Sequence, residues 1–358
     1  MGIMNFSEIM DRAIDVLKKY FGSIILFNLI YGIITTIVMF VLIFIGVIVG
    51  LIFGFATAGA LSSFKFGSLP IISMIIVGII VFVFIVIGIT ISRGLNVGVI
   101  RISSQEFVQG KIGFSEALGS TFKNIHKVLG LSFIEGILFL PALAVFLIPV
   151  YFFYYMAKSA DPNFKSTAAQ SALSVMLVLF CCTIVILLFI AVIYLYNTLF
   201  IFSVNSIIME NESVIGSLKR SWQLIKRDFW KLYGCNILIV LSISAIRYSL
   251  SSVIAVLVSI LLLILKLLNA NQNLLTYFNM IYSQLSWPIT IISYLIINPI
   301  GIIMTNLMYF NQRFKREGYD MTIELNKIQS NAKVIINERK QASGNIEFSN
   351  SNNSNKTT

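Results

Sequence analysis

Charged side chains are scarce in this chain of 358 residues. Only 11% of the residues are Asp, Glu, Lys or Arg, whereas soluble domains carry roughly 25%. Hydrophobic residues make up 58%, and the mean hydropathy is +0.90. This composition excludes an ordinary water-soluble domain and is typical of a protein that resides in a membrane.

Histidine and cysteine are also rare, which limits the chemistry that the chain can perform. His126 is the only histidine, and Cys181, Cys182 and Cys235 all lie in apolar stretches. One histidine cannot complete a zinc site or a Ser-His-Asp arrangement with so few carboxylates nearby. Thiols in apolar segments usually behave as small hydrophobic side chains. We therefore expect no metal, no cofactor and no enzymatic activity.

Long windows without charge predict an all-α polytopic membrane protein. A helix needs about 20 apolar residues to cross the hydrocarbon core of a bilayer, and several windows in this chain are longer. Six transmembrane helices are expected, near residues 23–54, 71–93, 131–157, 171–208, 235–267 and 275–311.

The few charges are distributed unevenly, with 26 basic against 15 acidic residues. Of the basic residues, 21 fall before the first span, in 93–127, in 219–231 or after residue 312. Basic residues near the ends of spans stay on the cytoplasmic side. The pattern therefore predicts a multi-pass protein of the cell membrane with both termini cytoplasmic. No groove-binding or base-stacking element supports binding to nucleic acid.

An amphipathic pattern recurs three times, at offsets of 108 and 100 residues. The apolar positions in each copy follow the i, i+4, i+7, i+11 spacing of one helical face. They are Met10, Ile14, Leu17 and Phe21; Leu118, Phe122, Ile125 and Leu129; and Leu218, Trp222, Ile225 and Phe229. We expect three interfacial helices, each leading into two spans. This organisation predicts parallel repeats at about 1–100, 101–210 and 211–318, with a largely disordered cytoplasmic tail over 319–358.

Basic and aromatic residues at the level of these helices favour contact with membrane lipids, anionic lipids above all. The expected lipid contacts are Lys18, Lys19, Lys127, Trp222, Lys226, Arg227 and Trp230. A protein partner or a homo-oligomer is compatible with the same pattern.

Three polar residues within the predicted spans need an explanation. Charges inside a bilayer are costly without a partner or water. Glu135 follows Gly130 closely enough to reach the headgroups, whereas Arg247 lies too deep in its span to do so easily. Asn298 precedes a proline, which either kinks the helix for packing or opens a binding site. These three residues are the candidate intramembrane functional residues.

Two glycine patterns carry structural expectations. Gly46 and Gly50 belong to a small-residue stripe with i+4 spacing, continued by Gly54 and Ala58, which predicts close helix packing either within the fold or between protomers. Gly130 closes the second amphipathic segment, as Gly22 closes the first, where each would let the chain turn from the membrane surface into a span.

Two regions resemble a known family. They contain SLKRSWQL (217–224) with FWKLYG (229–234), and YFNQRFKREGYD (309–320). The first is similar to the surface-helix motif, and the second to the closing motif, of the glycerophosphoryl diester phosphodiesterase membrane domain family. The likeness covers roughly residues 1–320. The catalytic barrel that gives the family its name, with its metal-binding carboxylates and catalytic histidines, is not recognised in this chain. The resemblance thus implies a bacterial membrane protein without transfer of an enzymatic activity.

Three functions remain as hypotheses. The first is a non-enzymatic multi-pass protein with a lipid-binding, accessory or scaffold role in the bacterial envelope. The second is a transporter or permease component that uses the intramembrane polar residues. The third is a membrane subunit that assists a glycerophosphodiester phosphodiesterase.

Overall fold

The computed structural model of this chain consists of helices joined by short connections. It describes residues 4–63, 69–107, 112–159, 168–267, 274–319, 321–325 and 328–329. Within these residues there is no strand, and six helices are long and apolar enough to cross a membrane. The elements are α1 (Phe6–Lys19), α2 (Phe21–Ser63), α3 (Leu69–Ser103), η1 (Ser104–Glu106), α4 (Phe114–Ser159), α5 (Ala168–Leu199), α6 (Ser203–Met209), α7 (Val214–Ile225), α8 (Phe229–Leu267) and α9 (Leu274–Glu317). The prediction of an all-α polytopic membrane protein is confirmed.

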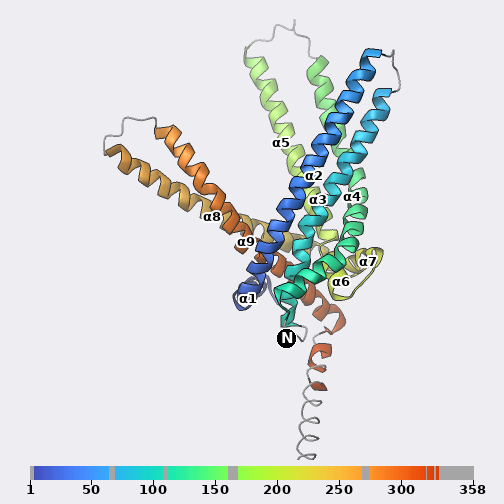
Figure 1. Ribbon diagram of the computed structural model, residues 1–358, viewed down its shortest axis with the longest axis vertical. Helices are drawn as coiled ribbons and strands as arrows, with labels where there is room; N and C mark the ends of the chain where they lie inside the picture. Colours follow the sequence, from blue (N-terminus) through green and yellow to red (C-terminus); the bar gives the residue numbers. More distant parts are fainter. Residues whose placement is uncertain are drawn as a thin grey trace, which may run out of the picture.

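The long helices form hairpins that project from one common end of the molecule. In Figure 1, α2/α3, α4/α5 and α8/α9 leave the same region, and the α8/α9 hairpin leans away from the others. The short helices α1, α6 and α7 lie together at that end, with the last turns of α9. We call this end the base. The predicted tail over 319–358 lies almost entirely outside the described residues.

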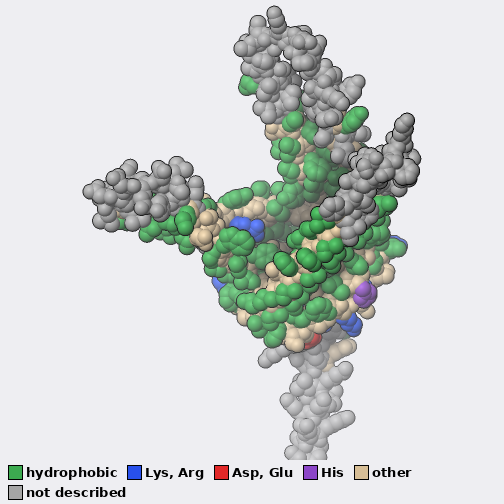
Figure 2. All heavy atoms as spheres, turned by 45° about the horizontal axis from the view of Figure 1, so that its top comes forward, with side chains coloured by type: hydrophobic (Ala, Val, Ile, Leu, Met, Phe, Trp, Pro, Cys, Tyr) green, Lys and Arg blue, Asp and Glu red, His purple; other side chains and the backbone are tan. Residues whose placement is uncertain are grey.

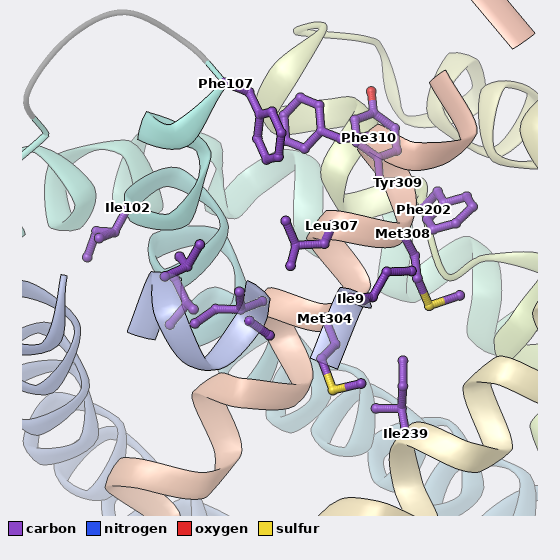
Figure 3. Close-up of a cluster of buried hydrophobic side chains, with 14 of the residues drawn as sticks. Ile9, Ile102, Phe107, Phe202, Ile239, Met304, Leu307, Met308, Tyr309 and Phe310 are labelled. Carbon is purple, nitrogen blue, oxygen red and sulfur yellow. The ribbon is translucent and has the colours of Figure 1, made fainter. Parts of the chain in front are cut away.

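The hydrophobic core lies in the base. Figure 3 shows Phe107 stacked on Phe310, with Phe202, just before α6, and Met304 of α9 in the same cluster. The ring centroids of Phe107 and Phe310 are 4.2 Å apart. Higher on the hairpins the apolar side chains face outward instead, and Phe40 is 72% exposed. Because lipid replaces protein as their surroundings, the hairpins need no core of their own.

Two predicted helix boundaries are wrong. The second amphipathic segment and the third span form the single helix α4, which runs without interruption through Gly130. A Cβ at Gly130 would lie 3.2 Å from a methyl group of Val214, so this glycine makes room for α7 and does not turn the chain. Gly22 likewise lies inside α2, and the chain turns two residues earlier, at Tyr20.

The predicted fourth span, 171–208, is not one helix: α5 ends at Leu199 and α6 begins at Ser203, within an apolar segment that runs on to Met209. A serine of α7 fits into the interruption that follows: the Ser221 hydroxyl donates to the Leu199 carbonyl over 2.9 Å and accepts from the Phe202 N–H over 3.4 Å. These bonds satisfy backbone groups that a broken helix exposes. The short helix α6 then lies buried in the base.

The three amphipathic segments bury residues at matching positions. Ile9, Ala117 and Ser217 are buried at offsets of 108 and 100 residues, and Ala13, Thr121 and Ser221 repeat the same pattern four residues later. The predicted apolar face is therefore divided. Its outer positions stay open, with Phe122 46% and Trp222 49% exposed. One edge of each segment contacts protein and the other is free to contact lipid.

Close packing between α2 and α3 depends on different glycines from those predicted. A Cβ at Gly94 would lie 1.9 Å from the Tyr31 hydroxyl oxygen, and one at Gly98 would lie 1.9 Å from the Phe27 ring. By contrast, nothing lies within 4 Å of a Cβ at Gly50, and Gly46 meets only Phe84 at 3.8 Å. The expectation of close packing within the fold at Gly46 and Gly50 is wrong, because space is left beside them. The remaining stripe residues, Gly54 and Ala58, have no described side-chain surroundings.

Candidate functional site

The three hairpins are connected at the base by a buried cluster of amide and hydroxyl groups. The Asn205 Nδ2 group donates to Asn306 Oδ1 over 2.8 Å, and Asn306 Nδ2 donates to Ser103 Oγ over 2.8 Å and to Ser104 Oγ over 3.3 Å. These residues come from α6, α9 and the end of α3 with η1, and all are nearly or fully buried. Buried amides with several partners fix the geometry of their surroundings. The cluster therefore sets the arrangement from which the hairpins diverge.

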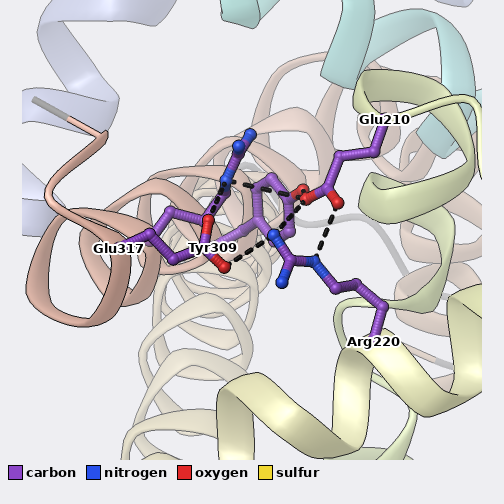
Figure 4. Close-up of polar contacts among 5 residues, drawn as sticks. Glu210, Arg220, Tyr309 and Glu317 are labelled. Carbon is purple, nitrogen blue, oxygen red and sulfur yellow. Dashed lines mark hydrogen bonds and ion pairs between the residues drawn. The ribbon is translucent and has the colours of Figure 1, made fainter. Parts of the chain in front are cut away.

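A second junction joins α7 to the end of α9 through charges. In Figure 4, Glu210 and Glu317 converge on Arg220, and Tyr309 points at Glu210. Arg220 lies 2.8 Å from Glu210 Oε2 and 2.6 Å from Glu317 Oε1. Tyr309 donates its hydroxyl hydrogen to Glu210. Arg313 lies 3.1 Å from Glu317, so two carboxylates meet two guanidinium groups.

Asp228 extends this junction to the start of α8. Its Oδ2 atom accepts hydrogen bonds from Lys315 over 2.8 Å and from Arg316 over 3.1 Å. The two regions that carry the family resemblance thus contact each other here, in a structural role. The hydrogen bond from Lys315 lowers the pKa of the Asp228 carboxyl below its ordinary value of 3.8. Sequence analysis missed this contact because each region was read by itself.

This lowered pKa predicts how stability depends on pH. A carboxyl whose pKa is lower in the folded state stabilises that state above its unfolded pKa, and the effect is lost as the pH falls through the folded pKa. We expect Asp228→Asn to unfold at a lower temperature than wild type at pH 7. The difference should shrink as the pH falls below about 4. Thermal unfolding of both proteins in detergent across pH 3–7 measures it, and a difference that is constant with pH would contradict the assignment.

Most of the predicted lipid contacts are exposed at the base. Lys18, Lys226 and Arg227 are exposed, as are Trp222 (49%) and Trp230 (73%). Lys19 and Lys127 also have protein partners. Lys19 donates to Glu106 over 3.0 Å, which raises the pKa of Lys19. Lys127 donates to Asn211 Oδ1 over 2.7 Å, connecting α4 to the segment before α7.

Glu135 of α4 is buried against α3. Its Oε2 atom is 2.5 Å from Arg93, and its side chain is only 6% exposed. Tyr196 of α5 donates its hydroxyl hydrogen to the Glu135 carbonyl oxygen. The charge of Glu135 is therefore matched within the protein. Arg93 was missed because it stands at the end of a charge-free window and was assigned to the following connection.

The other two candidates differ in their surroundings. Arg247 is exposed and lines a cavity of about 180 Å³ together with Ser251, Tyr282 and Ser293. It has no ion-pair partner among the residues that the structure describes. Asn298 is half-buried, and α9 is one helix that contains Pro299. The structure does not bring Glu135, Arg247 and Asn298 together in one site.

No group of three or more His, Cys, Asp or Glu side chains within the described ranges is arranged to hold a metal ion. Comparisons of this chain with models of protein families, with curated proteins and with solved structures found no match. The family resemblance therefore stays a prediction, and the described geometry carries the functional argument.

Proposed function

We propose that this chain is a non-enzymatic multi-pass protein of a bacterial cell membrane that binds anionic lipids at the cytoplasmic surface. In this role it serves as a lipid-binding, accessory or scaffold component. One observation carries the proposal. Each amphipathic segment buries one edge against the rest of the base and leaves aromatic or basic side chains exposed beside the spans.

The exposed aromatic residues give the level of the membrane surface. Trp222 in α7 and Trp230 at the start of α8 stand next to Lys226 and Arg227, where the chain passes from a short helix to a span. Trp side chains prefer the headgroup region, and nearby cations are attracted to anionic lipids. The base and its three amphipathic segments are well suited to lie on an anionic leaflet.

The resemblance to the glycerophosphoryl diester phosphodiesterase membrane domain family supports the same proposal. In such proteins the membrane region accompanies the chemistry and does not perform it. The contacts between 217–234 and 309–320 are structural, with ion pairs such as Arg220–Glu317 and Asp228–Lys315. An accessory role beside a separate enzyme is consistent with these contacts.

Anionic lipid binding at the base is tested with Lys226→Gln and Arg227→Gln. Each well-placed cation contributes roughly 1 kcal/mol at low salt, so each substitution should weaken binding of phosphatidylglycerol vesicles about fivefold. The protein is reconstituted into nanodiscs without detergent, and its co-sedimentation with labelled vesicles measures its affinity for them. Asp11→Asn, on the exposed face of α1, is the control and should not weaken it. Equal affinity of all variants, or binding insensitive to added salt, would overturn the proposal.

A further inference from the structure

A large cavity lies between the first and third hairpins within the membrane-spanning part. Its volume is about 770 Å³, within the range of about 300–1,000 Å³ that is common for ligand sites. Residues of α2, α3 and α9 line it, among them Asn28, Ser92 and Tyr294. In Figure 2 the hydrophobic surface between the α8/α9 and α2/α3 hairpins is hollowed, with a basic side chain at the edge.

The polar groups of this cavity present hydrogen-bond acceptors. Asn28 is only 1% exposed; its Nδ2 donates to the Leu295 carbonyl over 3.2 Å, while its Oδ1 atom has no partner within the described chain. Four of the lining hydroxyl groups already donate to backbone carbonyl groups, whereas the buried Thr35 hydroxyl, which also lines the cavity, has no partner within the described chain. Tyr31 donates to Ile91, Thr36 to Gly32, Ser286 to Ser283 and Thr290 to Ser286. A buried acceptor without a partner is costly, so a ligand that donates a hydrogen bond suits this cavity.

A positive charge adjoins the same cavity. The smaller cavity beside Arg247 shares Ser286 and Thr290 with the larger one, so the two are neighbours along α9. Arg247 lies inside a membrane span and lacks an ion-pair partner among the described residues. A cation at this depth is costly unless an anion or water matches it. A phosphate group would supply that match.

An apolar cavity continues from the other end. It holds about 570 Å³ between α2 and α3 and shares Met39 and Gly88 with the polar-lined cavity. Gly46, Gly50 and Phe84 line it, and the space exists because neither glycine carries a side chain. From Asn28 to Gly50 the helix rises about 33 Å. The joined cavities are therefore long enough for a whole acyl chain, since one leaflet contributes only half of a core of about 30 Å.

We propose that these joined cavities bind one phospholipid laterally from the membrane. Its phosphate would lie at Arg247, a hydroxyl hydrogen of its headgroup would be donated to Asn28 Oδ1, and one acyl chain would lie along Gly46 and Gly50. Phosphatidylglycerol has this chemistry, since it carries both an acidic phosphate and hydroxyl donors. The inference deepens the proposed lipid-binding role but concerns a separate place, because the surface site at Lys226 and Arg227 belongs to the base.

The chain part of this site is tested by filling it. Gly50→Leu places a side chain in the apolar cavity without a predicted clash, because nothing lies within 4 Å of its Cβ position. Gly78→Leu is the matched control: it also has open space, lies on α3 and does not line the cavities described above. At about 0.8 kcal/mol per displaced methylene, two lost contacts lower lipid retention about tenfold. Native mass spectrometry after reconstitution with phosphatidylglycerol measures retention. Equal retention by both variants would overturn the proposal.

The headgroup part is tested with Arg247→Gln and Asn28→Leu, and Asn298→Leu serves as the control for an asparagine in a span. We expect the first two variants to lose the tightly held phosphatidylglycerol and the control to keep it, at equal unfolding temperatures.

Phosphatidylcholine has a phosphate group but no hydrogen-bond donor, so wild type should hold it about tenfold more weakly than phosphatidylglycerol. Equal retention of the two lipids would overturn the headgroup assignment. Lys226→Gln should leave this tightly held lipid in place, so the surface proposal and the cavity proposal fail separately.

Discussion

Removal of the Glu135 carboxylate is expected to destabilise the fold by about 3–5 kcal/mol, the usual cost of leaving one member of a buried ion pair alone. In Glu135→Ala, Arg93 keeps its charge but loses the carboxylate 2.5 Å away, and only the Ser132 hydroxyl remains nearby, at 3.4 Å. Water has limited access to replace the carboxylate, because the Glu135 side chain is 6% and the Arg93 side chain 25% exposed. Reversible unfolding in mixed detergent micelles gives the free energy.

The double variant Arg93→Met with Glu135→Met provides the decisive comparison. Replacing both partners of a buried pair by apolar side chains is often neutral or stabilising. We therefore expect the double variant to recover most of the stability that Glu135→Ala loses. Glu116→Ala, an exposed carboxylate on the same helix α4, serves as the control and should change stability little. A double variant as unstable as the single one would show that the charges act on something other than each other.

Substitution of Gly98 is expected to have the second large effect. A Cβ there would lie 1.9 Å from the Phe27 ring, which is fully buried and stacked on Tyr31 with the ring centroids 5.6 Å apart. The ring has no free space to move into, so α2 and α3 must separate. Overpacking costs about 1–3 kcal/mol, while alanine regains about 1 kcal/mol of helix propensity. We expect Gly98→Ala to lose about 1–2 kcal/mol and Gly98→Leu to fail to assemble.

Two controls separate packing from the loss of glycine itself. Gly119→Ala lies in a helix with open space around the new Cβ, and it should stabilise the protein by up to about 1 kcal/mol. In the second control, Phe27→Leu is combined with Gly98→Ala, and the cost of the pair should be less than the sum of the single costs. Additive costs, or a Gly98→Ala variant as stable as Gly119→Ala, would contradict this account of the α2/α3 contact.

Two pairs of glycines show that the same spacing has different structural consequences on different helices. Gly46 and Gly50 have the spacing of a helix-packing motif, and so do Gly94 and Gly98. A Cβ at either glycine of the second pair would lie 1.9 Å from a large side chain of the facing helix, Tyr31 or Phe27, whereas one at Gly46 would only touch Phe84 at 3.8 Å and one at Gly50 would meet nothing within 4 Å. The first pair leaves an open cavity. The spacing of glycines on one helix indicates where another helix could approach closely. Whether it does depends on the side chains of the facing helix.

The sequence by itself determined the fold class, the number of spans and the presence of three amphipathic segments beside them. These features depend on composition and on periodicity along one helix, because each helix satisfies its own backbone hydrogen bonds in a membrane. It also identified Glu135 and Arg247 as charges that need a partner.

Only the tertiary structure decided which partners exist. Arg93 meets Glu135 because α3 and α4 pack side by side, and Arg247 faces a cavity that residues of α8 and α9 enclose between them. The end of α5 at Leu199 also involves a hydroxyl from another helix, that of Ser221. Contacts between residues far apart in the chain follow from how the helices pack, which periodicity along any one helix does not specify.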